Sequence, residues 1–161
     1  MGKLNQWLTL LANIGVLLGI GFLAIEIRQN TDMMRAQIRD SMSEKQMLTS
    51  EWMGTNEYAV DIYIRGTSGL LEPGTKEYAS FSFLLAGMWR EWENSLYQYE
   101  RGLYESSEFE PRIGRWRYNM RPAAVRELWK LTNGTYAPSF REKLDEIVIS
   151  IEKEEATDGD A

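Results

Sequence analysis

The residues best suited to chemistry are two carboxylates in the aromatic segment WREWENSLYQYERGLYE, residues 89–105. Glu93 and Glu100 are seven positions apart, so on a helix they lie on the same side, two turns from each other. If burial separated their pKa values, they could act as a general acid and a general base. The surrounding aromatic residues complete a candidate pocket: Trp89, Trp92, Glu93, Tyr97, Glu100, Trp116 and Trp129. The interpretation that we favour is structural, with both glutamates pairing with arginines and tyrosines where helices cross.

The composition excludes several classes of chemistry. The chain has 161 residues and contains neither histidine nor cysteine. It therefore lacks Ser-His-Asp and Cys-His catalysis, zinc-binding HExxH, thiolate metal sites and disulfides. Carboxylate pairs in helical bundles hold two metals with the help of Glu-x-x-His on partner helices, which this chain cannot supply. We therefore expect no cofactor and no metal, and we expect a protein that is not an enzyme.

A basic segment stands out at residues 111–130. It carries net charge +5, from six basic residues and one acidic residue, in a chain of net charge −6. The arginines are candidate contacts for anionic lipid or a protein partner: Arg112, Arg115, Arg117 and Arg121. The interpretation that we favour pairs this segment with the acidic last helix. The overall charge argues against a nucleic-acid partner, because such binding depends on neutralising phosphates.

The elements that must position these residues begin with a long apolar run. No charge occurs from Trp7 to Ile25, which as a helix would extend about 28 Å, close to the thickness of a bilayer core. The run is apolar on every side, so we predict a transmembrane anchor at residues 1–27. A buried helix of a soluble protein and an uncleaved signal-like segment are the alternatives. The excess of basic residues after the run (Arg28, Arg35 and Arg39, against Lys3 before it) predicts a cytoplasmic C-terminal domain.

Small residues share one arc of this helix, namely Ala12, Gly15 and Gly19, with Glu26 on the same arc. A GxxxG spacing allows close approach of a second membrane helix, so we predict that this face binds another copy or a larger membrane complex. The three arginines that follow are further candidates for contact with anionic lipid or a partner.

Beyond the apolar run, no glycine or proline occurs between Gly21 and Gly54. The first helix therefore either continues as one rod or restarts near residue 30. Five apolar residues share a face of this continuation, with Met42 at its margin: Ile27, Met34, Ile38, Leu48 and Trp52. We expect this apolar stripe to pack against the domain that follows, and the alternative is a helix lying on anionic lipid.

The remaining sequence predicts an all-α fold of about five helices. Helical periodicity occurs at residues 56–66, 78–103, 107–120, 121–131 and 138–154, and no convincing β alternation is present. We predict a bundle domain at residues 28–155 and a frayed acidic tail at residues 156–161.

Three segments carry a resemblance to known proteins: AIEIRQNT (residues 24–31), WENSLYQYERGL (92–103) and LWKLTNGTYAPSFREKLDEI (128–147). With the apolar helix before them, they resemble a family of small uncharacterised bacterial proteins with one N-terminal membrane helix and a small helical domain. The resemblance implies a bacterial inner-membrane location and no catalytic residues. We expect a membrane-anchored interaction or scaffold protein that binds membrane lipid and either itself or a larger complex. A tethered small-molecule-binding or histidine-free enzymatic domain is the alternative.

Overall fold

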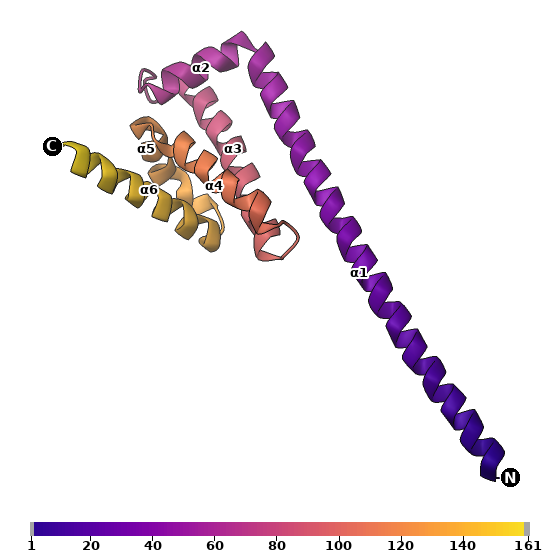
Figure 1. The fold of residues 1–161 in the computed structure, drawn as a ribbon. Helices are drawn as coiled ribbons and strands as arrows, with labels where there is room; N and C mark the ends of the chain where they lie inside the picture. The colour runs from indigo at the N-terminus through magenta and orange to yellow at the C-terminus, as the bar shows by residue number, and fades with distance from the viewer. Residues whose placement is uncertain (1, 160–161) are drawn as a thin grey trace. The chain divides into compact units, whose positions relative to one another are not determined.

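The computed structural model describes residues 2–159, and within them it contains helices and no strand. The helices are α1 (Gly2–Thr55), α2 (Glu57–Thr67), α3 (Lys76–Glu100), α4 (Ser106–Met120), α5 (Ala123–Thr132) and α6 (Pro138–Gly159), with a 3₁₀ turn, η1 (Asn133–Thr135), before α6 (Figure 1). The predicted all-α fold is confirmed.

The first helix, α1, is unbroken from Gly2 to Thr55 and does not restart at residue 30 (Figure 1). The chain divides into two units, of which the first ends at Ser41 and the second begins at Met42. The sequence predicts that the bundle domain begins at residue 28, whereas the second unit begins at Met42. The two boundaries differ because Met42 is the one buried residue of α1, so the residues of α1 that precede Met42 belong to no core.

Side-chain caps and left-handed glycines determine where α2 and α3 begin and end. The backbone N–H groups of Ala59 and Tyr78 donate to the side chains of Asn56 (3.0 Å) and Thr75 (3.2 Å), which satisfies first-turn donors of α2 and α3. The helix α3 was expected to reach residue 103 but ends at Glu100, because Gly102 follows with a φ of 68°. Only glycine adopts this conformation readily, and it stops the helix.

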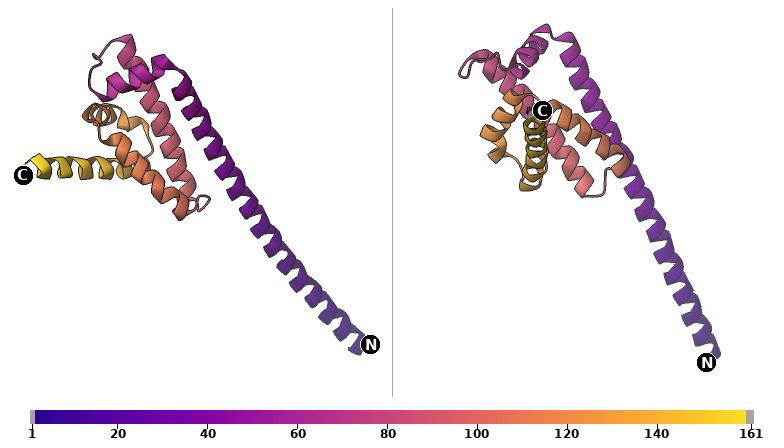
Figure 2. Two further views of the ribbon diagram at one scale, coloured as in Figure 1. Left: turned by 45° about the horizontal axis from the view of Figure 1, so that its top comes forward. Right: turned by 60° about the vertical axis from the view of Figure 1, so that its left-hand side comes forward.

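The second unit is organised around α3, which contacts α2 and α4, while α4 contacts α5 and α6 (Figures 1 and 2). The buried face of α3 follows the predicted three- and four-residue steps, at Phe81, Leu85, Trp89, Trp92 and Leu96. The last helix completes the core with its own buried residues, Phe140, Leu144, Ile147, Val148 and Ile151. Side chains of the second unit therefore fill its core.

The apolar stripe of α1 does not pack as predicted. Leu48 and Trp52, which lie in the second unit, are exposed. The residue of α1 that is buried is Met42, at the margin of the stripe, where the Ser95 hydroxyl donates to its sulfur (3.7 Å). The side of α1 that contacts α3 is therefore the side of Met42, and the predicted stripe lies on a different side of the helix.

The helix α6 is longer than predicted and runs through Gly159, so it includes part of the expected frayed tail. Asp160 and Ala161 lie outside the described residues. Near this end of α6, Glu154 and Glu155 form ion pairs with Arg117 and Arg126. Sequence periodicity carries no information about such long-range partners.

Candidate functional site

The four tryptophans of the candidate pocket lie in the core of the second unit, and none of them lines the hollow described below. Each is 4% exposed or less. Trp92 stacks on Trp116 at 5.3 Å between ring centroids, and Trp89 meets Trp129 edge-on at 5.2 Å. Paired rings of this kind stabilise a core beyond the area that they bury. The predicted pocket residues therefore fall into two groups. The four tryptophans lie in the core, and the surface group consists of Glu93, Tyr97 and Glu100.

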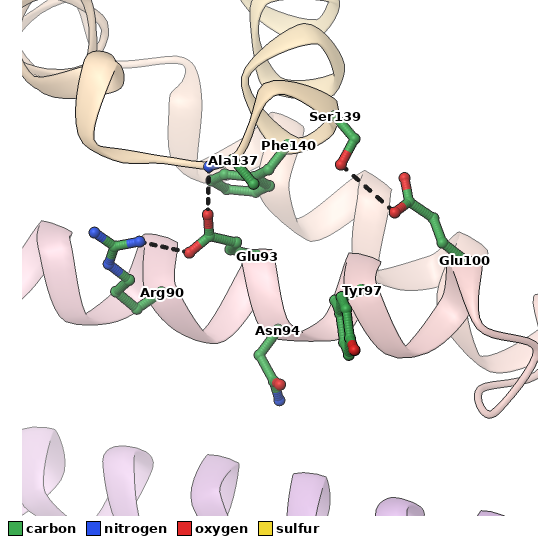
Figure 3. Close-up of a pocket in the computed structure, with 8 residues that line it drawn as sticks. All are labelled: Arg90, Glu93, Asn94, Tyr97, Glu100, Ala137, Ser139 and Phe140. Carbon is green, nitrogen blue, oxygen red and sulfur yellow. Dashed lines mark hydrogen bonds and ion pairs between the residues drawn. The ribbon is translucent and has the colours of Figure 1, made fainter.

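That surface group lines a hollow between α3 and the start of α6 (Figure 3). The hollow has a volume of about 290 Å³ and is open to solvent. Three of its lining residues were predicted, Glu93, Tyr97 and Glu100, and the others are Arg90, Asn94, Ala137, Ser139 and Phe140. The sequence thus predicted the α3 side of the hollow and missed the α6 side, which is more than 35 positions away in the chain.

Both carboxylates in the hollow already have partners (Figure 3). Glu93 pairs with Arg90 (2.6 Å) and accepts a hydrogen bond from the backbone N–H of Ala137 (2.7 Å). Glu100 lies 3.5 Å from the hydroxyl of Ser139, in the first turn of α6. Negative groups are favourable at a helix N-terminus, where N–H groups lack helical partners. The two glutamates therefore fasten the start of α6 to α3, through a backbone N–H and a serine hydroxyl. The predicted pairing with arginines and tyrosines across helices is not what these contacts show, because Arg90 lies on the same helix as Glu93.

Two tyrosine side chains have raised pKa values. Burial raises the pKa of Tyr136, with the Arg90 guanidinium lowering it and the Glu93 carboxylate raising it further. Burial also raises the pKa of Tyr63, and Tyr118 adds to this while Arg115 opposes it. Desolvation disfavours the charged phenolate in both cases. Among the described residues, no group of three acidic side chains is placed to hold a metal ion.

Arg112 belongs to the inside of the second unit and does not face a lipid or a partner. Its side chain is 10% exposed, forms an ion pair with Glu91, and lies over the ring of Tyr104 (5.7 Å to the centroid). The side-chain oxygen of Gln46, in the amide orientation that satisfies both groups, accepts from Arg112 at 2.6 Å. This network joins α3, α4 and the end of α1, so the predicted lipid contact at Arg112 is corrected.

The other basic residues of α4 and α5 mostly meet α6. Arg117 pairs with Glu154 and donates to Ser150 (2.8 Å), so within this chain it contacts α6. Three further cross-helix ion pairs involve residues of α5: Arg126 with Glu155 (2.6 Å) and Glu152 (3.8 Å), and Lys130 with Glu152 (2.6 Å). Arg115 and Arg121 are exposed. The basic segment thus pairs with the acidic last helix, as we favoured.

The predicted association face of α1 is open in this chain. Ala12, Gly15, Gly19 and Glu26 are exposed, and a Cβ built on either glycine would meet no atom within 4 Å. Arg28 and Arg39 are also exposed, and Arg35 pairs with Asp32 at 3.7 Å.

By length and composition, α1 is a candidate membrane span, and none of its most apolar 18 residues is buried. Comparison of the chain with protein-family models, with curated proteins and with solved structures gives no match.

Proposed function

We propose that this chain is a single-pass membrane protein whose helical domain acts as an interaction or scaffold module, either as a homo-oligomer or as an accessory subunit of a membrane complex. One observation carries the proposal. A helix with an uncharged run from Trp7 to Ile25 is exposed all along that run. Apolar surface of this extent is unfavourable in water and favourable among acyl chains.

Features of the second unit support a binding role over catalysis. Its core is filled by packed aromatic rings, and its paired carboxylates fasten α6 to α3. The partner in this proposal is another copy or a larger membrane complex. It meets the small-residue face at Ala12, Gly15 and Gly19 and the amphipathic continuation of α1. Membrane lipid surrounds the span, and nucleic acid is not a partner.

The proposed location is the inner membrane of a bacterium, with the C-terminal domain in the cytoplasm. The distribution of basic residues supports this orientation, because Lys3 precedes the span and Arg28, Arg35 and Arg39 follow it. The resemblance of AIEIRQNT and the two later segments to small bacterial membrane proteins supports the same location.

The second candidate function is a tethered small-molecule-binding or enzymatic domain. It is supported by the hollow beside Glu93, Tyr97 and Glu100. A ligand there would have to displace the hydrogen bond from Ala137 to Glu93 or use the ring of Tyr97, which is half exposed. For this reason we place it second.

The proposal is tested by expressing the full chain in a bacterium and separating membranes from cytosol. We expect the chain in the membrane fraction, extracted only by detergent, and co-purifying with itself or with other membrane proteins when its mass is measured in mild detergent. Recovery from the cytosol without detergent would contradict membrane anchorage.

Orientation is tested with a cysteine introduced at an exposed position of α4, Ser107→Cys, because the chain has no cysteine of its own. A membrane-impermeant maleimide should label it only after the inner membrane is opened. Labelling in intact cells would place the domain outside the cytoplasm.

A further inference from the structure

A row of apolar side chains continues on α1 beyond the candidate span. Ile27 is 67% exposed and Met34 is 41% exposed, while Ile38 is partly covered. Polar and charged residues surround them in the sequence, so membrane insertion alone does not account for these three residues. An exposed apolar row on one face of a helix indicates a surface that is covered by something else.

The row follows the spacing of a coiled coil. Alternate steps of four and three residues connect eight residues, which we call the α1 seam: Asn13, Leu17, Ile20, Ala24, Ile27, Thr31, Met34 and Ile38. A repeat of 3.5 residues keeps such positions in line when two helices wind around each other with a left-handed twist. Because α1 is unbroken, the seam runs without a kink from the span into the polar part of the helix, over about 38 Å.

Asn13 gives this seam a polar group that needs a partner. It lies in the uncharged run, where hydrocarbon offers no hydrogen bonds. The other polar residue of the run, Thr9, satisfies itself by donating to the carbonyl of Asn5 (2.9 Å). Among the described residues, none forms a hydrogen bond with the Asn13 side chain. Asparagine in a membrane helix forms hydrogen bonds across helix pairs, and two copies in register would bring two Asn13 amides together.

The charges beside the seam favour one orientation of two copies. Arg28 and Arg35 lie on one flank, and the uncharged Asn30 and Gln37 lie on the other. In a parallel pair, each flank faces the opposite flank of the partner, so arginine meets an uncharged amide. In an antiparallel pair, like flanks meet, and the arginines of the two copies would repel each other. Membrane insertion with one orientation gives the parallel arrangement as well.

From these observations we infer that the α1 seam is the contact surface for a second copy of this chain, in a parallel dimer with Asn13 paired to Asn13. This inference rests on the proposed membrane anchorage and goes beyond it by naming the partner and the face. The glycine face is the competing surface for self-association, with Gly19 about 100° and Gly15 about 140° around the helix from Ile20.

Cysteine cross-linking tests the inference, since the natural chain contributes no thiol of its own. The full-length variants Leu17→Cys and Met34→Cys place thiols on the seam in both halves of α1. Gly19→Cys tests the glycine face, and Leu18→Cys is the control outside the seam, about 100° around the helix from Leu17. Each variant is oxidised in native membranes with copper phenanthroline, and the dimer is measured on non-reducing gels.

We expect both seam variants to give several-fold more disulfide-linked dimer than Leu18→Cys and Gly19→Cys. Strong cross-linking at both positions requires a parallel pair, because an antiparallel pair brings identical residues together only near its centre. Adding Asn13→Leu should lower the cross-linking of Met34→Cys, whereas Thr9→Val should leave it unchanged. Dominant cross-linking at Gly19→Cys, or equal yields at all positions, would overturn the inference.

The two proposals fail in different ways. If the variants reach the membrane but the seam does not cross-link, the dimer surface is wrong and membrane anchorage stands. If the chain remains in the cytosol, the proposed function itself fails.

Discussion

Gly66→Ala is the sharpest test of the packing between α2 and α3. Gly66 is buried near the end of α2, and a Cβ built on it would lie 2.3 Å from Cδ2 and 2.5 Å from Cγ of Phe81. Carbon atoms pack at about 3.5–4.0 Å, so the ring would have to retreat by more than about 1 Å. Phe81 is 1% exposed and faces the core, so it has no free space into which it can move.

The magnitude follows from two opposing contributions. Inserting a methyl group into a packed core costs about 1–3 kcal/mol, and the short contact places Gly66→Ala at the upper end. Alanine in a helix regains about 1 kcal/mol over glycine, which leaves a net loss of about 2 kcal/mol. The matched control is Gly87→Ala in α3, where a Cβ meets no atom within 4 Å. The control should be stabilised by about 0.5–1 kcal/mol.

The assay is urea denaturation of the full chain in mild detergent, followed by tryptophan fluorescence, because Trp89, Trp116 and Trp129 are buried in the unit being tested. The two variants should differ by about 3 kcal/mol in free energy of unfolding, with the wild type between them. If Gly66→Ala unfolds at the same urea concentration as Gly87→Ala, or at a higher one, the α2–α3 packing described above is wrong.

Three further predictions concern polar contacts of the second unit. Arg126→Ala should lower the free energy of unfolding by about 3 kcal/mol, because it removes the donor to the carbonyl groups of Met120 and Arg121 and leaves Glu155 unpaired. Lys130→Ala, at an exposed pair, should cost less than about 1 kcal/mol in the same urea titration. Asp145→Ala should lower the free energy of unfolding by about 1–3 kcal/mol, because the buried indole N–H of Trp129 donates to the Asp145 carboxylate at 2.7 Å. Asp145→Asn keeps an acceptor and should lower it less. Equal losses for the two variants would contradict this role of Asp145. Burial raises the pKa of Tyr63 above 10.0, so the folded state holds this proton more tightly than the unfolded state. The stabilisation that this raised pKa gives the folded state is fully present below pH 10 and is lost as the pH rises through the pKa of folded Tyr63. When the free energy of unfolding is measured between pH 9 and pH 11, Tyr63→Phe should therefore show a smaller decrease than the wild type.

The sequence predicted well the features that depend on local periodicity and capping. The buried face of α3 follows from apolar residues at three- and four-residue steps, from Phe81 to Leu96. The Thr75 side chain that caps the start of α3 is a signal of the same local kind. These signals lie within one or two helical turns, so they can be recognised without knowing the fold.

Features that depend on distant partners could not be predicted in the same way. A sequence segment rich in tryptophan and glutamate is compatible with a ligand pocket, and equally with a packed core whose glutamates form ion pairs at the surface. The burial of Trp89 and Trp129 in the structure shows that these two residues belong to the core. The ion pairs near the end of α6 involve Arg117 and Arg126, which lie on α4 and α5, far from α6 in the sequence. On α1, the predicted packing face was the apolar stripe that includes Leu48 and Trp52, whereas the buried residue is Met42 at the margin of that stripe. Met42 is a single apolar residue beside a longer stripe, so the sequence pattern favoured the stripe.

The position of α6 in the chain has a consequence for synthesis. Phe140, Leu144 and Val148 are buried parts of the core and belong to α6, which is made after α1 to α5. Until the ribosome has released them, Trp116 and Trp129 lack the ring of Phe140 against which they pack, at 5.9 and 5.7 Å between centroids. The apolar run of α1, by contrast, is made before them. If α1 spans a membrane as proposed, the span can insert before the bundle closes, and the nascent domain exposes its aromatic residues to chaperones in the interval.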